Sequence, residues 1–281
     1  MAATGRVWKA EFSGRWQEPV AALLDASGLA GEIGERRRVL IKPNLVEALA
    51  PPVTTPAALV EAVVAYVRRR LPRCEVVIGD GTGSLDYDTF HAFRVLGYEE
   101  LARRRSVRLV DLNTEPLERL EDPALERWPV LFLPRIVMES FLISVPVLKA
   151  HTLAGVTLTM KNMMGAAPPL HYQAGGHWKK SAFHAGIHEA VADLNRYRSP
   201  DFTVLDATVG MSEAHLWGPT CDPPPGLISA GFDPVAADAY GAALLGRDWR
   251  SIGHIAAVDG ELGRAAPVEV VDVSCAGGNL L

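Results

Sequence analysis

Cysteine is scarce in this sequence, and the few cysteines are too far apart along the chain to form a common metal-binding or disulfide motif. The 281 residues include three cysteines, Cys74, Cys221 and Cys275, far apart along the chain. None belongs to a CxxC pair, so neither a disulfide framework nor a zinc or iron–sulfur site built on that motif is expected.

Long apolar runs and blocks of basic residues are missing as well. No stretch has the length and apolarity of a membrane span, and the first 16 residues contain no apolar signal-peptide core. The net charge of -5 argues against a nucleic-acid partner. We therefore expect a cytoplasmic protein with neither a membrane nor a nucleic-acid partner. A small anionic ligand remains compatible with this charge, because its binding depends on the local field in a cleft.

Familiar nucleotide motifs are incomplete. The segment GDGTGS, residues 79–84, follows an apolar run and resembles a phosphate-binding loop. It has no third glycine at the GxGxxG position, and the Gly-Lys-Ser/Thr of a P-loop does not occur. Asp80 and Thr82 are candidates for binding a metal, a ribose or another polar ligand. The alternative is an ordinary turn between a strand and a helix.

Strand-like and helix-like segments alternate along the chain. In the first half they form a βαβαβ pattern, which predicts an α/β fold with a mostly parallel sheet and helices on both faces. We expect one unit over residues 1–281, with a smaller inserted subdomain at about 114–200. The expected strands are Arg38–Ile41, Glu75–Ile78, Val107–Leu112, Val130–Leu133, Ile136–Met138, Phe141–Val147, Phe202–Asp206 and Val268–Val273. Four helices are expected: one that starts at Thr55-Pro56 with Thr55 as its cap, one from Phe90 to Leu101, one from Ala182 to Tyr197, and one that starts at Asp233. Residues Pro168–Lys180 are expected to form a loop or lid.

Polar residues follow several of these strands directly. Lys42 and Asn44 follow the first strand, Asp80 the second and Asp206 a later one. Because ligands of such sheets bind beyond the carboxyl ends of the strands, these side chains predict a ligand cleft. For Pro43-Asn44 the alternative is a tight turn.

The stretch PVLKAHTLAGVTLTMKNMMGAAP, residues 146–168, contains the strongest group of candidates: Lys149, His151, Lys161 and Asn162. Charged groups beside a buried strand must be paired or must meet an anionic ligand. A histidine near two cations should be neutral, and therefore suited to act as a base or metal ligand. The lysines can hold a carboxylate or phosphate, and one of them, if desolvated, can act as nucleophile or proton donor. The alternative places Lys161 on an exposed helix face and His151 at a turn.

His184 and His188 are four residues apart in an expected helix, a spacing that puts both rings on one face and suits a metal ion. The HExxH order of zinc proteases is absent. A solvated helix face is the alternative.

Several segments together resemble the domain of unknown function 362 (DUF362) family, among them VLIKPNLVE, VVIGDGTG and SAGFDPVAADAYGAALLG. The resemblance extends from about Val39 to Ala256, and K-x-H followed by T-L-x-x-K-N is its most specific element. Many relatives carry, or are linked to, ferredoxin-like cysteine motifs that hold four-iron clusters. Since this chain has no such motif, the resemblance implies that any redox reaction needs a separate ferredoxin-like electron donor. Residues 146–168 are also similar to the region of nickel-pincer lactate racemases where a lysine and a histidine hold an organonickel cofactor. This implies that His151 and Lys161 face a cofactor or a hydroxy- or keto-acid.

The predicted function is that of an enzyme acting on a small anionic metabolite. The reaction type stays open between a redox reaction with an external electron donor, an isomerisation and a hydrolysis, with oxidoreductase- or isomerase-like chemistry on a small acid expected. In this hypothesis Lys149 and Lys161 bind the anion and His151 is the acid/base. The remaining ligand-binding candidates are Lys42, Asn44, Asp80, Thr82, Asn162 and Asp206. The alternative is a non-catalytic carrier or interaction module that holds a divalent metal, an iron–sulfur cluster or a cofactor through His184, His188 and Cys221.

Overall fold

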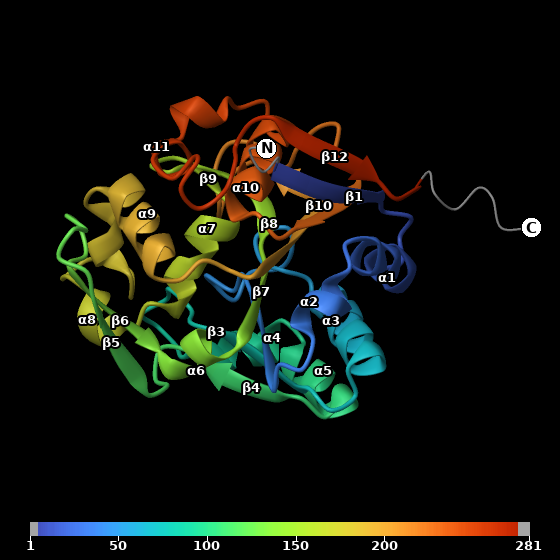
Figure 1. Cartoon of the computed structure of the whole chain (residues 1–281). Coiled ribbons are helices and arrows are strands. Elements are labelled where there is room, and N and C mark those ends of the chain that lie inside the picture. Colours follow the sequence, from blue (N-terminus) through green and yellow to red (C-terminus); the bar gives the residue numbers. More distant parts are fainter. Residues whose placement is uncertain (1–4, 275–281) are drawn as a thin grey trace, which may run out of the picture.

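A large, mostly parallel sheet forms the centre of the protein. The computed structural model describes residues 5–274, so Cys275 lies outside the described part. Figure 1 shows strands β1 and β12 at one edge of the sheet and β4 at the other, in the order β12-β1-β11-β10-β7-β2-β3-β4. Only β11 runs antiparallel to its neighbours along this path. The strands are β1 (Gly5–Glu11), β2 (Arg38–Pro43), β3 (Glu75–Asp80), β4 (Arg108–Asp111), β7 (Phe141–Val145), β10 (Phe202–Met211), β11 (Leu227–Gly231) and β12 (Val268–Asp272).

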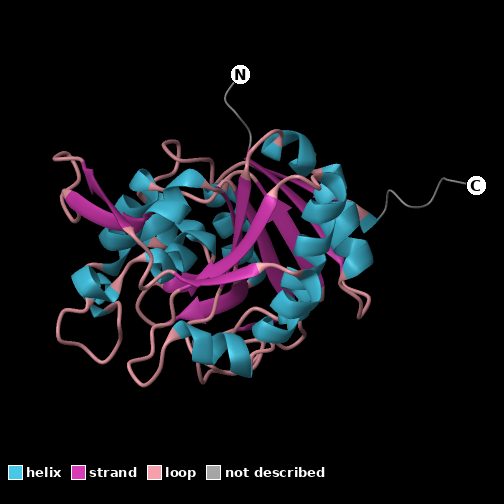
Figure 2. Ribbon diagram, turned by 90° about the horizontal axis from the view of Figure 1, so that it is seen from below, coloured by secondary structure: helices cyan, strands magenta, loops and turns pink. Residues whose placement is uncertain are grey.

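Helices cover both faces of this sheet, as Figure 2 shows, so the predicted α/β class is confirmed. Successive side chains of a strand point to opposite faces. Accordingly Leu40 of β2 packs in one core, while its neighbours Val39 and Ile41 pack in the other. The helices are α1 (Gln17–Ala26), α2 (Leu29–Ile33), α3 (Ala57–Arg70), α4 (Thr89–Val95), α5 (Tyr98–Arg105), α6 (Arg135–Glu139), α7 (Thr159–Asn162), α8 (Pro169–Tyr172), α9 (Ile187–Tyr197), α10 (Pro234–Leu244) and α11 (Gly253–Ala256), with 3-10 turns η1 (Met163–Ala166), η2 (Ser181–His184) and η3 (Trp249–Ser251).

Two local expectations for the first half are wrong. Thr55 does not cap α3, because its hydroxyl donates to Val145 O at 2.6 Å and accepts from Asn44 N at 2.8 Å. The single helix expected from Phe90 to Leu101 is two helices, α4 and α5, separated by Gly97 at a φ of +81°. Few side chains tolerate that left-handed conformation, so glycine ends the first helix here.

The second half also departs from expectation in two places. Residues 136–138, expected as a strand, belong to helix α6, and the expected strand at Val130–Leu133 pairs with an earlier segment: β6 (Val130–Pro134) is antiparallel to β5 (Leu117–Glu121). The helix expected over 182–197 is interrupted by Gly186, at a φ of +69°, into η2 and α9. The cap at Asp233 is confirmed, since its carboxylate accepts from Val235 N and Ala236 N.

The buried strand expected over Phe141–Val147 divides at Pro146, and this division builds the site. After it, the chain continues as β8 (Val147–His151), which pairs with β10 and with the short antiparallel β9 (Gly155–Thr157). Residues 114–200 thus contribute both to the main sheet and to the separate β5–β6 hairpin, and the subdomain stays a prediction. Within residues 5–274, no helix combines the length and apolarity required to cross a bilayer.

Candidate functional site

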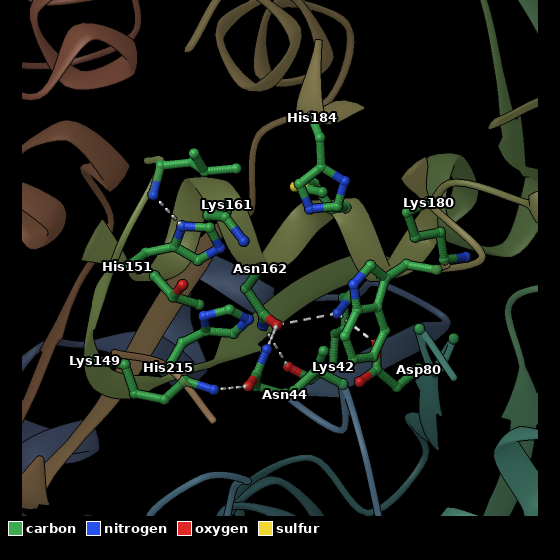
Figure 3. A pocket seen from close by; sticks show the side chains of 18 of the residues that line it. Lys42, Asn44, Asp80, Lys149, His151, Lys161, Asn162, Lys180, His184 and His215 are labelled. Atoms are coloured by element: carbon green, nitrogen blue, oxygen red, sulfur yellow. Dashed lines mark hydrogen bonds and ion pairs between the residues drawn. The ribbon is translucent and has the colours of Figure 1, made fainter. Parts of the chain in front are cut away.

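A cavity of about 390 Å³ lies beyond the carboxyl ends of β2 and β3, next to the β8–β9 ribbon. It brings together side chains that are more than a hundred positions apart in the sequence (Figure 3). Of the candidates named from the sequence, eight line it: Lys42, Asn44, Asp80, Lys149, His151, Lys161, Asn162 and His184. A cleft at the strand ends is therefore present in the structure.

One wall contains a buried ion pair. Lys42 Nζ lies 2.6 Å from Asp80 Oδ1, and the other carboxylate oxygen accepts from Leu45 N at 2.6 Å. Burial lowers the pKa of Lys42, and the Asp80 charge acts in the opposite direction. A Cβ on Gly165 would lie 2.3 Å from Asp80 Oδ1, so only glycine permits this close approach. The two charges of this pair neutralise each other, and the surrounding atoms enclose them closely. The role of the pair is therefore to hold the neighbouring side chains in position.

A network of amides extends from this ion pair. Asn162 Oδ1 accepts from Lys42 Nζ at 3.2 Å and from Asn44 Nδ2 at 3.1 Å. Its amide nitrogen donates to Lys42 O and to Ser144 Oγ. All four hydrogen-bonding positions of this side chain are occupied. Asn162 therefore lines the cavity without a free group to offer a ligand.

Two further lysines face the cavity without a carboxylate partner among the described residues. Lys149 Nζ donates to Asn44 Oδ1 at 2.8 Å and to Val53 O at 2.6 Å, both neutral acceptors. Burial and the nearby Lys161 lower the pKa of Lys149 well below its usual range. Lys161 Nζ has no hydrogen-bond or ion-pair partner in the described part of the chain, and burial lowers its pKa to about 8. Of these two amines, Lys161, with a pKa of about 8, is mostly protonated at pH 7 and carries a positive charge without a counterion among the described residues.

Two buried polar atoms on the same side of the cavity are also unsatisfied. His151 Nε2 and Thr157 Oγ1 have no hydrogen-bond partner within residues 5–274. The register explains their common direction: Lys149 and Thr157 are directly opposed across β8 and β9, and His151 is two residues beyond Lys149. Lys161 follows in α7, and Figure 3 shows its side chain beside the His151 ring. Three groups with free hydrogen-bonding capacity therefore converge.

Helix α7 is held in place by a buried carboxylate. Asp238, on α10, accepts from Thr159 N at 2.7 Å and from Met160 N at 3.0 Å. These amides belong to the first turn of α7 and have no partner within the helix. Burial raises the pKa of Asp238 to about 7. Lys161 follows these two residues directly, so Asp238 fixes where its side chain enters the cavity.

The structure does not bring Asp206 and Thr82 into the cavity. Strand β10 continues to Met211, so Asp206 is not at a strand end, and its carboxylate accepts from Thr208 N and Thr208 Oγ1. Thr82 Oγ1 donates to Val46 O at 3.0 Å, and Thr82 N donates to Thr89 Oγ1. Thr82 therefore holds its loop against Val46, whereas Asp206 makes its hydrogen bonds within strand β10.

His184 and His188 are not neighbours on a common helix face, because Gly186 separates η2 from α9. His184 lines the cavity, whereas His188 does not, and its Nδ1 lies 3.2 Å from His254 Nδ1. Cys221 is half-buried and does not line the cavity. Within residues 5–274, no group of three or more His, Cys, Asp or Glu side chains is arranged to hold a metal ion.

Sequence reasoning missed Lys180, His215 and Trp178, which also line the cavity. Lys180 Nζ donates to Asn113 Oδ1 and to Ala167 O, and burial lowers its pKa to about 7. The His215 ring stacks on His151 with centroids 4.1 Å apart. All three lie in irregular loops, where no periodic pattern in the sequence indicates the direction of a side chain.

Comparisons with known proteins agree with this architecture. The lactate racemase apoprotein from Thermoanaerobacterium thermosaccharolyticum has a similar fold, with a TM-score of 0.53 and 14% sequence identity. The alignment covers 86% of this chain and 57% of the racemase, so the chain spans little more than half of that protein's length. No curated protein matches the sequence. The model of the family described as "Domain of unknown function (DUF362)" matches residues 39–243, and the chain therefore belongs to the DUF362 family.

Proposed function

We propose that this chain is an enzyme that acts on a small anionic metabolite, a carboxylate or a phosphate. The observation that carries the proposal is the ammonium group of Lys161, which faces the cavity without a partner among the described residues. Next to it, two buried polar atoms, His151 Nε2 and Thr157 Oγ1, also have no partner. A charged group in such surroundings is stabilised when an opposite charge enters.

The balance of charge in the cavity supports an anion rather than a cation. Among the residues that the structure describes, one carboxylate lines it, that of Asp80, against four lysines: Lys42, Lys149, Lys161 and Lys180. Lys42 is neutralised by its ion pair. The volume of about 390 Å³ suits a small metabolite.

The ionisation of Lys161 supports acid–base chemistry. With a pKa of about 8, a substantial fraction of its amine is neutral slightly above neutral pH. A group whose pKa lies near the working pH is an efficient proton donor or acceptor. Anion binding would raise this pKa again, so the bound ligand controls the protonation of the group next to it.

The other functions considered from the sequence receive less support. A redox reaction would require a separate ferredoxin-like electron carrier, since Cys74 and Cys221 are single free thiols. These free thiols are compatible with the cytoplasmic location that we propose. A carrier that holds a metal between His184 and His188 would need both rings at one place, and only His184 lines the cavity.

The proposal is tested by thermal unfolding of the wild type and of Lys161→Met with acetate, oxalate and inorganic phosphate. A ligand that binds only the folded protein stabilises it by about 2.7 kcal/mol at 100 times its dissociation constant. We expect at least one anion to raise the Tm of the wild type and to have no effect on Lys161→Met. Lys9→Met removes a lysine on β1 that pairs with Asp272, and it should respond like the wild type. If no anion stabilises the wild type, or if Lys161→Met responds equally, the proposal is wrong.

A further inference from the structure

The hydrogen bonds of His151 determine which of its ring nitrogens carries the proton. Its Nδ1 accepts from two backbone amides, Leu153 N and Ala154 N, each at 3.1 Å. Figure 3 shows one such hydrogen bond to the ring. A nitrogen that accepts hydrogen bonds presents its lone pair and is not protonated. In the neutral imidazole, the proton must therefore be on Nε2.

The ring is also held in its neutral form. Burial lowers the pKa of His151 far below its ordinary value, and the charges of Lys161 and His215 act in the same direction. Protonation would place a hydrogen on Nδ1, directly against the two amide hydrogens of the turn between β8 and β9. Local geometry and the surrounding charges thus favour the same state.

The Nε2–H group is buried and unsatisfied in the described part of the chain. A buried donor without a partner costs about 1–3 kcal/mol, so a ligand that supplies an acceptor gains this free energy. The unsatisfied Thr157 Oγ1 and the ammonium of Lys161 lie on the same side of the cavity. Together these three groups can donate hydrogen bonds to the oxygen atoms of a carboxylate or phosphate, and the negative charge of the ligand strengthens these hydrogen bonds.

We propose that His151 is a neutral hydrogen-bond donor to an oxygen of the anionic ligand, through Nε2–H, and is not the proton acceptor of the site. This inference rests on the proposed function and assigns the acid–base role to Lys161. The ligand must present a carboxylate or phosphate oxygen to Nε2. A protonated or otherwise hydrogen-donating group of a ligand would meet another donor there and be rejected.

The same geometry bears on the nickel cofactor that the sequence resemblance implies. A metal bound at Nε2 requires the lone pair of that nitrogen, which moves the proton to Nδ1. There it would collide with the amides of Leu153 and Ala154. His151 therefore does not fit a nickel ion held through Nε2.

The tautomer can be measured on the full-length wild-type chain without any ligand. Long-range ¹H–¹⁵N correlation spectra distinguish a protonated from an unprotonated ring nitrogen, and the spectrum of His151→Gln identifies the signals of His151. We expect a protonated Nε2 and an unprotonated Nδ1, unchanged between pH 5 and pH 8 and after addition of Zn²⁺. The opposite tautomer, titration near pH 6.5, or loss of the Nε2 proton on addition of Zn²⁺ would overturn the inference.

Ligand binding provides the second measurement. His151→Gln retains an N–H donor near the position of Nε2 but cannot titrate, whereas His151→Leu has no donor. With acetate, oxalate or phosphate as probes, we expect His151→Gln to bind within about threefold of the wild type and His151→Leu to bind at least tenfold more weakly. Equal losses in both variants would refute the donor role. If no probe binds the wild type, the proposed function fails, while the spectra still decide the tautomer.

Discussion

Replacing Lys161 by methionine should make the ligand-free protein more stable. Its ammonium lies in the cavity wall with about 9% of the residue exposed and without a partner in the described part of the chain. Methionine has a similar length and volume and no charge, so it fills the same space. A binding residue whose charge is uncompensated until the ligand arrives reduces the stability of the empty protein.

The magnitude follows from the two pKa values of this lysine. Burial lowers the value to about 8 in the folded protein, against the ordinary 10.5. A difference of roughly 2.5 units, at 1.36 kcal/mol per unit, corresponds to about 3 kcal/mol. Between pH 8 and 10.5 the unfolded chain binds more protons, so the stability of the wild type rises with pH there. The advantage of Lys161→Met is therefore complete below pH 8 and disappears above pH 10.5.

Unfolding by urea and by heat, at pH 7 and at pH 10, measures this effect. At about 2 °C per kcal/mol for a chain of this length, Lys161→Met should unfold roughly 6 °C above the wild type at pH 7. Lys9→Met is the matched control: it removes an ion pair near the surface, so its stability should equal or fall slightly below that of the wild type. A Lys161→Met protein that is no more stable than the wild type at pH 7 would refute the reasoning, because the ammonium would then be adequately solvated or paired.

Two other perturbations test buried charged and titratable groups. Gly165→Ala should cost about 3 kcal/mol and abolish anion binding, because the added Cβ would lie 2.3 Å from Asp80 Oδ1 and separate a buried ion pair. Acidification should destabilise the folded protein through His254, whose pKa is lowered to about 3 by burial and by the nearby His188 and Lys161. Since the unfolded histidine binds its proton near pH 6.5, the folded protein should lose about 2 kcal/mol more than His254→Asn between pH 7 and pH 5, as measured by urea unfolding.

Each of these perturbations has its own control. Gly31→Ala adds a methyl group in α2 where nothing lies within 4 Å, so it should be neutral or slightly stabilising. Equal effects of Gly31→Ala and Gly165→Ala would contradict the account of the ion pair. Equal losses of stability in the wild type and in His254→Asn on acidification would show that the imidazole is not kept neutral by burial.

The predictions from sequence succeeded where a short segment determines its own structure. Hydrophobic spacing identified the alternating strands and helices, because burial of one face imposes a period of 2 or 3.6 residues. The sequence also indicated the region that lines the cavity, because two lysines and a histidine follow a buried strand at short spacing: Lys149, His151 and Lys161. Helix ends were less reliable: Gly97 and Gly186 divide helices because their backbones take a positive φ, which the hydrophobic pattern does not reveal.

Other features of the site depend on contacts between distant parts of the chain. Asp206 appeared equivalent to Asp80, but β10 continues past it, and strand length is set by pairing with neighbouring strands. Lys180 and His215 reach the cavity from loops, whose paths depend on what they pack against.

The sequence by itself determined the α/β class and the presence of lysine and histidine after a buried strand, because periodicity and residue type are local properties. Only the tertiary structure decided which of those side chains have a partner. Lys42 is neutralised by Asp80, 38 residues away, whereas Lys161 is left without a partner among residues 5–274. The hydrogen bonds of His151 Nδ1 were likewise decided by the turn that supplies the amides of Leu153 and Ala154. Charge compensation and hydrogen bonding depend on distances in space, and these exist only once the chain has folded.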